Sequence, residues 1–233
     1  MNAYYIGLYK SGAPFNENIV QQVLSSLKKA LPDFFPATLQ TDENIFIAIN
    51  SEEDFNYSLV PDSYWIEKGL SVRIPLIGKN QVELSIIDDR ESLYIPSSII
   101  LKWKETDKLP ETAQLEQILS ELISATSPSY AYVSNESIAL NDAFYERSFS
   151  VNEAEVPAAL YWITWFGPQQ LKSISPEQLD ALQSFREIKI QACAHGKLVT
   201  LTREAFDENN PAHVQLREKA EGVCGLTAIY ESL

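Results

Sequence analysis

Both cysteines and both histidines of the chain lie in its C-terminal part, as Cys193, His195, His213 and Cys224. Thiolate and imidazole are preferred zinc ligands, but none of these spacings matches a structural ligand pair. Cys193 and His195 also suggest a nucleophile and its base, although the sequence identifies no third residue to orient them. We therefore interpret the cysteines as small buried thiols, His195 as a turn residue, and His213 as a first-turn helix residue on a solvated face.

The run Glu187-Ile188-Lys189 is the sharpest enzyme hypothesis in the sequence. In metal-dependent nucleases of the restriction type, a carboxylate holds the metal and a lysine two positions later polarises the attacked phosphate. The same alternation is typical of any half-buried strand, which is the interpretation that we favour. A glycine-rich phosphate loop, a nucleophile elbow and a zinc-protease helix motif are all missing from the sequence. We therefore predict that the chain is not an enzyme and uses neither a cofactor nor a metal.

Acidic clusters next to aromatic residues are the candidate binding features. One cluster precedes Phe55 and three later aromatic residues, and a second precedes Leu93-Tyr94. Interfaces favour aromatic anchors, and carboxylates can steer a basic partner onto them. The residues predicted to contact a partner are Glu52, Glu53, Asp54, Tyr57, Tyr64, Trp65, Asp88, Asp89 and Glu91. The alternative is that they are ordinary charged loop residues beside the aromatic ends of strands.

The net charge limits the class of partner. Acidic residues outnumber basic ones by 32 to 18, which gives a formal charge of −14. A surface of that sign repels phosphate backbones and anionic lipid headgroups, so we expect neither nucleic acid nor membrane as a partner. Opposite charge speeds protein association, so a basic protein fits better. The alternative is that the charge serves solubility alone.

Hydrophobic periodicity predicts the elements that would position these residues. In the first half, we expect strands over Ala3–Tyr9, Ile45–Ile49, Leu70–Ile77, Gln81–Ile87 and Ser98–Trp103, with helices over Ile19–Leu31 and between Pro110 and Pro128. In the second half, we expect strands over Tyr130–Val133, Ala159–Trp165, Glu187–Cys193 and Lys197–Thr202. Ser175-Pro176 and Asn210-Pro211 each predict a capped helix start, and Gly222 predicts the end of the second of these helices.

These elements favour the α+β class, with a largely antiparallel or mixed sheet packed with about four helices. We expect a single domain over residues 1–233, with room for two intimate lobes that meet near residues 103–110. The first residues lack a basic leader and a cleavage site, and no apolar run has the length of a membrane span, so we expect a cytoplasmic protein.

Several segments resemble the immunity protein 52 family of bacterial antitoxins. They are Tyr4–Tyr9, Pro128–Val133, Leu160–Phe166, Gly196–Thr202, Phe206–His213 and the closing Gly225-Leu226. The sequence departs from the family pattern after the first strand, where Lys10-Ser11-Gly12 stands in place of a tryptophan-glycine turn and an arginine. The resemblance implies an antitoxin that binds a restriction-endonuclease-like toxin, often in type VI secretion or a related competition system. An acidic adaptor, a secretion chaperone and a metal-dependent hydrolase remain alternatives.

Overall fold

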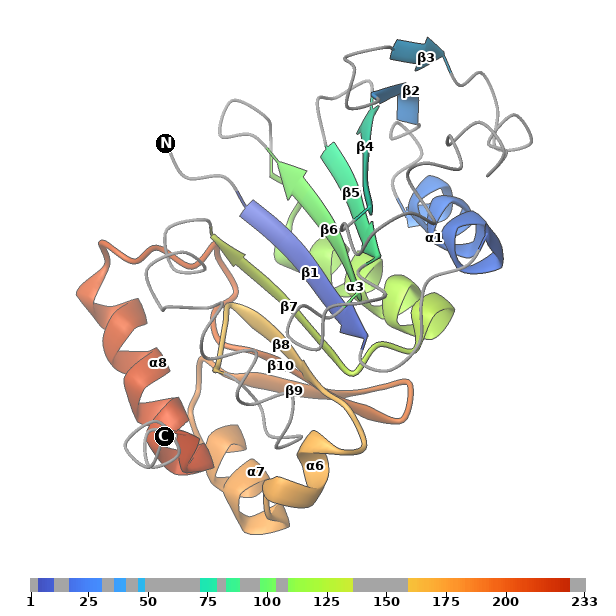
Figure 1. Ribbon diagram of the computed structural model, residues 1–233. Helices are drawn as coiled ribbons and strands as arrows, with labels where there is room; N and C mark the ends of the chain where they lie inside the picture. The colour runs from blue at the N-terminus through green and yellow to red at the C-terminus, as the bar shows by residue number, and fades with distance from the viewer. Residues whose placement is uncertain are drawn as a thin grey trace.

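A computed structural model describes residues 4–10, 17–30, 36–40, 46–48, 72–78, 83–88, 97–103, 109–135 and 159–226. Within these ranges, ten strands form one sheet in the order β3-β2-β4-β5-β6-β1-β7-β8-β10-β9. All nine described strand pairings are antiparallel. Helices accompany the sheet, so the predicted α+β class is confirmed (Figure 1).

The strands are β1 (Tyr4–Lys10), β2 (Pro36–Gln40), β3 (Phe46–Ala48), β4 (Val72–Gly78), β5 (Glu83–Asp88), β6 (Ser97–Trp103), β7 (Tyr130–Asn135), β8 (Ile163–Phe166), β9 (Lys189–Cys193) and β10 (Gly196–Thr200). The helices are α1 (Glu17–Ala30), α3 (Thr112–Thr126), α6 (Gln170–Ser173), α7 (Pro176–Gln183) and α8 (Pro211–Cys224). β2 and α6 are elements that the sequence patterns did not predict.

Strand β1 joins the two halves of the sheet. It pairs with β6 on one side and with β7 on the other, so Gly7 lies between Ile100 and Tyr132. Its apolar side chains Ile6 and Leu8 are fully or almost fully buried. The sheet therefore continues from the first half of the chain into the second, and the lobe boundary near residues 103–110 stays a prediction.

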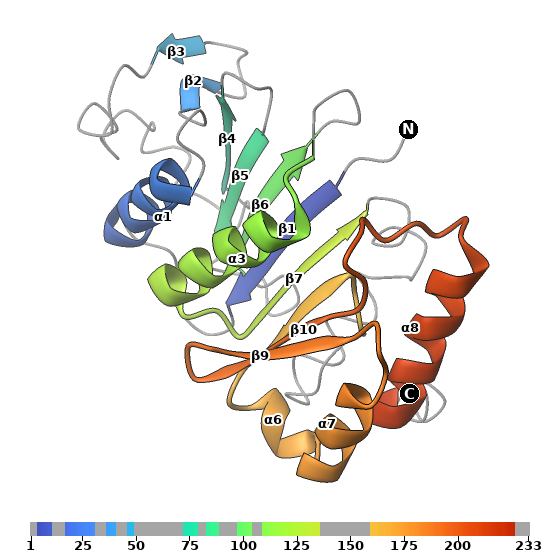
Figure 2. The same ribbon diagram turned by 180° about the vertical axis from the view of Figure 1, so that it is seen from behind.

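Helices α1 and α3 pack against one another on one face of the sheet (Figures 1 and 2). Leu115, Ile118, Leu119 and Leu122 of α3 are fully buried at the helical spacing that the sequence predicts. Lys29 of α1 donates to Glu121 of α3 over 2.7 Å. Both predicted amphipathic helices are thus confirmed.

Helices α7 and α8 pack together beside the end of the sheet that holds β8, β10 and β9 (Figure 1). The Ser175 side chain accepts from the Gln178 backbone N–H, and the Gln178 side chain accepts from the Ser175 N–H, so the predicted capping box is present. Asn210 caps α8 through the Ala212 N–H. The prediction that Gly222 ends this helix is wrong, because Gly225 ends it with a φ of 73°.

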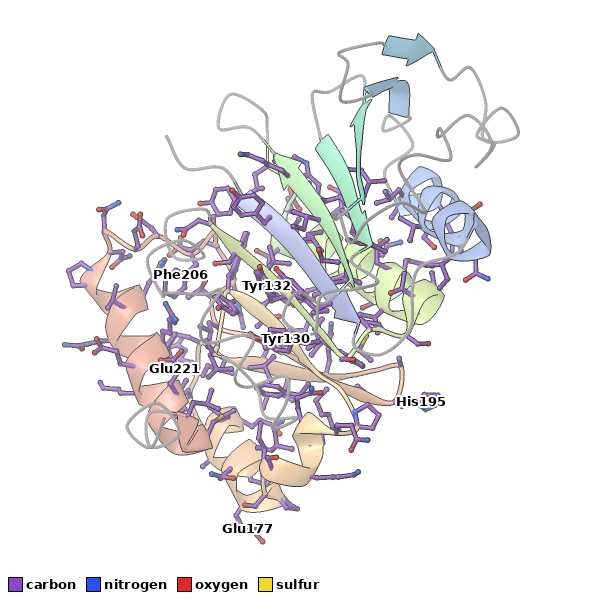
Figure 3. The ribbon with its side chains drawn as sticks, viewed as in Figure 1. Tyr130, Tyr132, Glu177, His195, Phe206 and Glu221 are labelled. Atoms are coloured by element: carbon purple, nitrogen blue, oxygen red, sulfur yellow. The ribbon has the colours of Figure 1, made fainter. Side chains whose placement is uncertain are left out.

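A cluster of buried tyrosines lies where β1, β7 and the segment before β8 meet. The Tyr9 and Tyr132 hydroxyl groups are 3.1 Å apart, and the ring centroids of Tyr132 and Tyr161 are 4.5 Å apart. Tyr130 donates its hydroxyl hydrogen to the Ala159 carbonyl over 2.9 Å. Figure 3 shows Tyr130 and Tyr132 in the middle of the molecule. Burial raises the pKa of Tyr132 well above the ordinary value of 10.0, and nearby Tyr9 raises it further.

Candidate functional site

The acidic and aromatic loop residues predicted to contact a partner fall almost entirely outside the described residues. These are Glu52, Glu53, Asp54, Tyr57, Tyr64, Trp65, Asp89 and Glu91. Asp88 is the exception, since it is the last residue of β5 and its backbone pairs with Val72 of β4. These nine contact residues therefore stay a prediction.

A buried carboxylate on α3 forms the main polar cluster of the described structure. Glu116 is only 6% exposed, because it lies on the same stripe as the buried apolar residues of the helix. Thr200 of β10 donates to its Oε1 atom over 2.6 Å. Lys189 and Gln191 of β9 donate to its Oε2 atom over 2.5 and 3.3 Å. A buried carboxylate needs such donors, so this cluster fastens α3 to the β9–β10 hairpin.

Glu187 and Lys189, the two charged residues of the nuclease-like run in the sequence, have different surroundings in the structure. Lys189 is engaged with Glu116, whereas Glu187 is exposed and precedes the first residue of β9. The prediction that the strand begins at Glu187 is therefore wrong by two residues, because the Ile188 N–H still forms a turn with the Phe185 carbonyl. Within the described ranges, no three His, Cys, Asp or Glu side chains gather as a metal site would require.

Two neighbouring hollows open beside this cluster. The first, here called the α3 hollow, has a volume of about 690 Å³. It is lined by Leu109, Pro110, Glu111, Thr112, Ala113, Glu116, Trp162, Glu187, Lys189, Thr200, Arg203, Glu204 and Ala205. The Thr112 hydroxyl group donates to the Arg203 carbonyl over 2.5 Å, which ties the start of α3 to the loop after β10.

The second hollow, here called the α8 hollow, has a volume of about 670 Å³. It is lined by Phe185, Arg186, Glu187, Thr202, Arg203, Glu204, Asn210, Ala212, His213, Gln215, Leu216 and Lys219. Glu187, Arg203 and Glu204 line both hollows and so form the wall between them. Both volumes lie in the range of ~300–1,000 Å³ that is typical of small-ligand pockets.

No protein-family model matches the chain, and no curated protein matches it by sequence. A solved structure does match it: Pseudomonas aeruginosa T6SS protein PA0821, with a TM-score of 0.59. The superposition covers 96% of this chain and 73% of that chain, at 11% sequence identity. The chain shares the fold of PA0821. At this identity the likeness shows the fold alone.

His213 lies in the first turn of α8, as predicted, but the prediction that it faces solvent is wrong. Its side chain lines the α8 hollow, and the residue is only 8% exposed. The Asp207 backbone N–H donates to Nδ1 over 3.0 Å, and Nε2 lies 3.3 Å from a Glu204 carboxylate oxygen. Because Nδ1 accepts a hydrogen bond, the geometry fits a neutral ring that carries its hydrogen on Nε2. His213 therefore holds the loop before α8 in place.

His195 and the two cysteines occupy the places that the sequence predicts. His195 is exposed at the tip of the β9–β10 hairpin and points away from the molecule (Figure 3). Cys193 and Cys224 are free, buried thiols. Cys193 donates to the Ser120 hydroxyl group over 3.4 Å, next to the Glu116 cluster. Burial, with a contribution from Glu221, raises the pKa of the Cys224 thiol from 9.0 to about 12.

The raised pKa values predict a loss of stability in alkali. The folded state keeps Cys224 and Tyr132 protonated where the unfolded chain has released those protons. Their stabilising contribution is complete below pH 9.0, and that of Cys224 is lost as the pH rises from 9.0 to about 12. Urea denaturation at a series of pH values should therefore show a free energy of unfolding that falls above pH 9.

The variants Cys224→Ala and Tyr132→Phe test this assignment, because each removes one ionisable group from the core. Each variant is expected to have a shallower fall of unfolding free energy with pH than the wild type. Tyr9→Phe is the matched control for lost hydrogen bonding, since it breaks the same contact with Tyr132 but keeps the Tyr132 hydroxyl group. Equal slopes in the wild type and both variants would assign the alkaline loss to other groups.

The described part of the chain contains no helix with the length and apolar character of a membrane span. The main chemical features of the described part are two hollows, the buried Glu116 carboxylate paired with Lys189, and the exposed charged residues around the hollows. Sequence reasoning missed Glu116, although a glutamate next to Leu115 on an apolar stripe was a usable signal.

Proposed function

We propose that this chain is an immunity protein of the immunity protein 52 type. It binds a cognate bacterial toxin, a nuclease delivered by type VI secretion or a related system, and neutralises it without catalysis. The observation that carries the proposal is the fold likeness to a T6SS protein, which extends over 96% of this chain.

The placement of the family-like segments supports the same proposal. Four of them fall on β1, β7, β8 and β10 or overlap these strands. These four strands are immediate neighbours in the sheet. The resemblance therefore falls on one continuous part of the sheet, which is consistent with the proposal. Two further segments, Phe206–His213 and Gly225-Leu226, begin and end α8.

The charge of the chain supports the choice of partner. At −14, the protein attracts a basic nuclease and repels the nucleic acid on which that nuclease acts. We propose that complex formation takes place in the cytoplasm of the producing cell. There the immunity protein covers or distorts the active cleft of the toxin.

Stoichiometric inhibition tests this function. The toxin encoded by the reading frame next to that of this chain should kill cells when it is expressed alone and spare them when both are expressed. With purified proteins, nuclease activity should fall linearly and reach zero at one equivalent of this chain. The chain alone should cleave no nucleic acid in magnesium or manganese. An unrelated protein of equal net charge is the control, and it should leave the toxin active.

Three results would contradict the proposal, each in favour of a different alternative. Cleavage of nucleic acid by this chain would favour the metal-dependent hydrolase. Inactivation of the toxin at far less than one equivalent would indicate catalysis. Binding that leaves the toxin active but increases its export would favour an acidic adaptor or a secretion chaperone.

A further inference from the structure

We infer that the α3 hollow is a docking site for the toxin and receives a lysine or arginine side chain of that partner. The inference rests on the proposed function, and it names the surface that performs it. It concerns a different part of the chain from the acidic loops predicted from the sequence. The argument depends on the apolar walls of the hollow, on the sign of its rim and on the charges of the neighbouring hollow.

The walls of the α3 hollow suit the aliphatic stem of a long side chain. Leu109 and Pro110 precede α3, Ala113 lies in its first turn, and Ala205 comes from the loop after β10. Trp162 forms the floor, where its indole N–H is already used in a 3.0 Å hydrogen bond to the Thr202 carbonyl. These walls offer apolar contact without an unsatisfied donor. Lysine and arginine place their methylene groups against such surfaces while their charged ends stay near water.

The rim of the hollow has the opposite charge to such a side chain. Glu111, Glu187 and Glu204 are all exposed around it. Within the described residues, the side chains of Glu111 and Glu187 form no hydrogen bond or ion pair, whereas the Glu204 side chain contacts His213. Glu116 lies deeper and is balanced by Lys189. Four carboxylates line the hollow against the two cations Lys189 and Arg203, so its net charge is negative and a cation of the partner would balance it.

The neighbouring α8 hollow restricts where the basic side chain can enter. Its lining includes Arg186 and Lys219, which are exposed and have no partner among the described residues. Three cations and two carboxylates line the α8 hollow, whereas four carboxylates and two cations line the α3 hollow, so a cation is favoured at the α3 end. The two hollows share Glu187, Arg203 and Glu204, so this change of sign occurs between immediate neighbours. The charge pattern thus selects the α3 end, although the two hollows have similar volumes.

Charge reversal at the rim tests the site, with the same change on α7 as the matched control. The test variant is Glu111→Lys with Glu187→Lys, and the control is Glu177→Lys with Asp180→Lys. Both change the net charge equally, and both place one lysine near a helix N-terminus, because Glu111 is the N-cap of α3 and Glu177 lies in the first turn of α7. Helix α7 lines neither hollow, and Glu177 lies at its outer end (Figure 3).

The readout is the dissociation rate of the complex with the toxin from the adjacent reading frame, measured by surface plasmon resonance. We expect the rim variant to dissociate about 100-fold faster than wild type and the α7 control to stay within about 3-fold. The milder pair Glu111→Gln with Glu187→Gln should give an intermediate rate. Melting temperatures of all variants show whether each one is folded, and the glutamine pair keeps the test valid if the lysine variant is unstable.

Two outcomes overturn the inference. If the rim variants are folded and dissociate at the wild-type rate, the α3 hollow is not part of the interface. If the rim variant and the α7 control have the same dissociation rate, the effect comes from net charge alone. Failure of the proposed function looks different, because wild-type protein would then neither bind nor inhibit the toxin. A further check is a lysine-to-glutamate scan of the toxin, in which one reversal should restore tight binding to the Glu111→Lys, Glu187→Lys variant.

Discussion

Gly196→Ala is expected to destabilise the protein by about 3 kcal/mol or more. A Cβ atom at this first residue of β10 would lie 2.2 Å from the Phe166 carbonyl oxygen and 2.7 Å from Nε1 of Trp165. The backbone of β8 cannot move away without disturbing its pairing with β10. The same Trp165 nitrogen donates to the Cys193 carbonyl over 3.1 Å, and this bond would be strained too. Urea unfolding followed by tryptophan fluorescence measures the loss.

Gly222→Ala is the matched control, because the same Cβ atom at that position would meet nothing within 4 Å. Residue 222 lies inside α8, where alanine is favoured over glycine by about 0.5–1 kcal/mol, so this variant should be more stable than wild type. If Gly196→Ala were as stable as wild type, the close approach of β8 to β10 would be wrong. The outcome also concerns function, since the β9–β10 hairpin places Lys189 and Thr200 against Glu116.

Local signals explain why most elements could be predicted from the sequence. The apolar stripe of α3 and the capping box at Ser175 each depend on residues a few positions apart. The strands predicted over Leu70–Ile77 and Gln81–Ile87 correspond to β4 and β5 for the same reason. Such features form wherever the local sequence permits them. They gave the correct fold class and left the order of the strands open.

The errors occurred where contacts distant in sequence override a local pattern. The apolar run from Ala159 predicted a strand, but β8 begins only at Ile163. The Leu160 N–H donates instead to the Glu221 carboxylate, 61 positions away, and the Tyr161 N–H donates to the Thr164 hydroxyl group. Gly222 could not be recognised as a helix-interior residue from its neighbours alone. Glu221 just before it accepts from Arg217 and from the Leu160 N–H, which fixes this part of α8 against the segment before β8.

The α3 hollow was beyond the reach of sequence patterns for the same reason. Its walls combine the start of α3 with the loop after β10, and the Thr112 to Arg203 hydrogen bond joins residues 91 positions apart. Exposed glutamates are common in an acidic chain, and nothing local distinguishes Glu111 or Glu187 from the others. Only the fold brings these carboxylates around one apolar hollow.

Association with the toxin is expected to slow by about 10–100-fold as salt rises from about 0.05 to 0.5 M. The cause is the attraction between a chain of charge −14 and a basic nuclease, which salt screens over a Debye length of ~10 Å at 0.1 M. Dissociation should change less, because contacts inside the complex are close and partly shielded from solvent. Stopped-flow mixing at several salt concentrations gives both rates.

Charge reversal of Glu52, Glu53 and Asp54 to lysine separates steering from anchoring. Each reversal changes the net charge by +2, so the three together change it from −14 to −8, and association should slow while dissociation changes little. Trp65→Ala should do the opposite if this tryptophan is an anchor, since truncated aromatic hot spots typically cost ~2 kcal/mol or more and act on dissociation. A folded Trp65→Ala protein with unchanged affinity would remove that loop from the interface, and the Asp88-Asp89-Glu91 cluster would be tested next. Association rates that ignore salt would instead mean that the acidic charge serves solubility, in which case the rim of the α3 hollow would act at contact range alone.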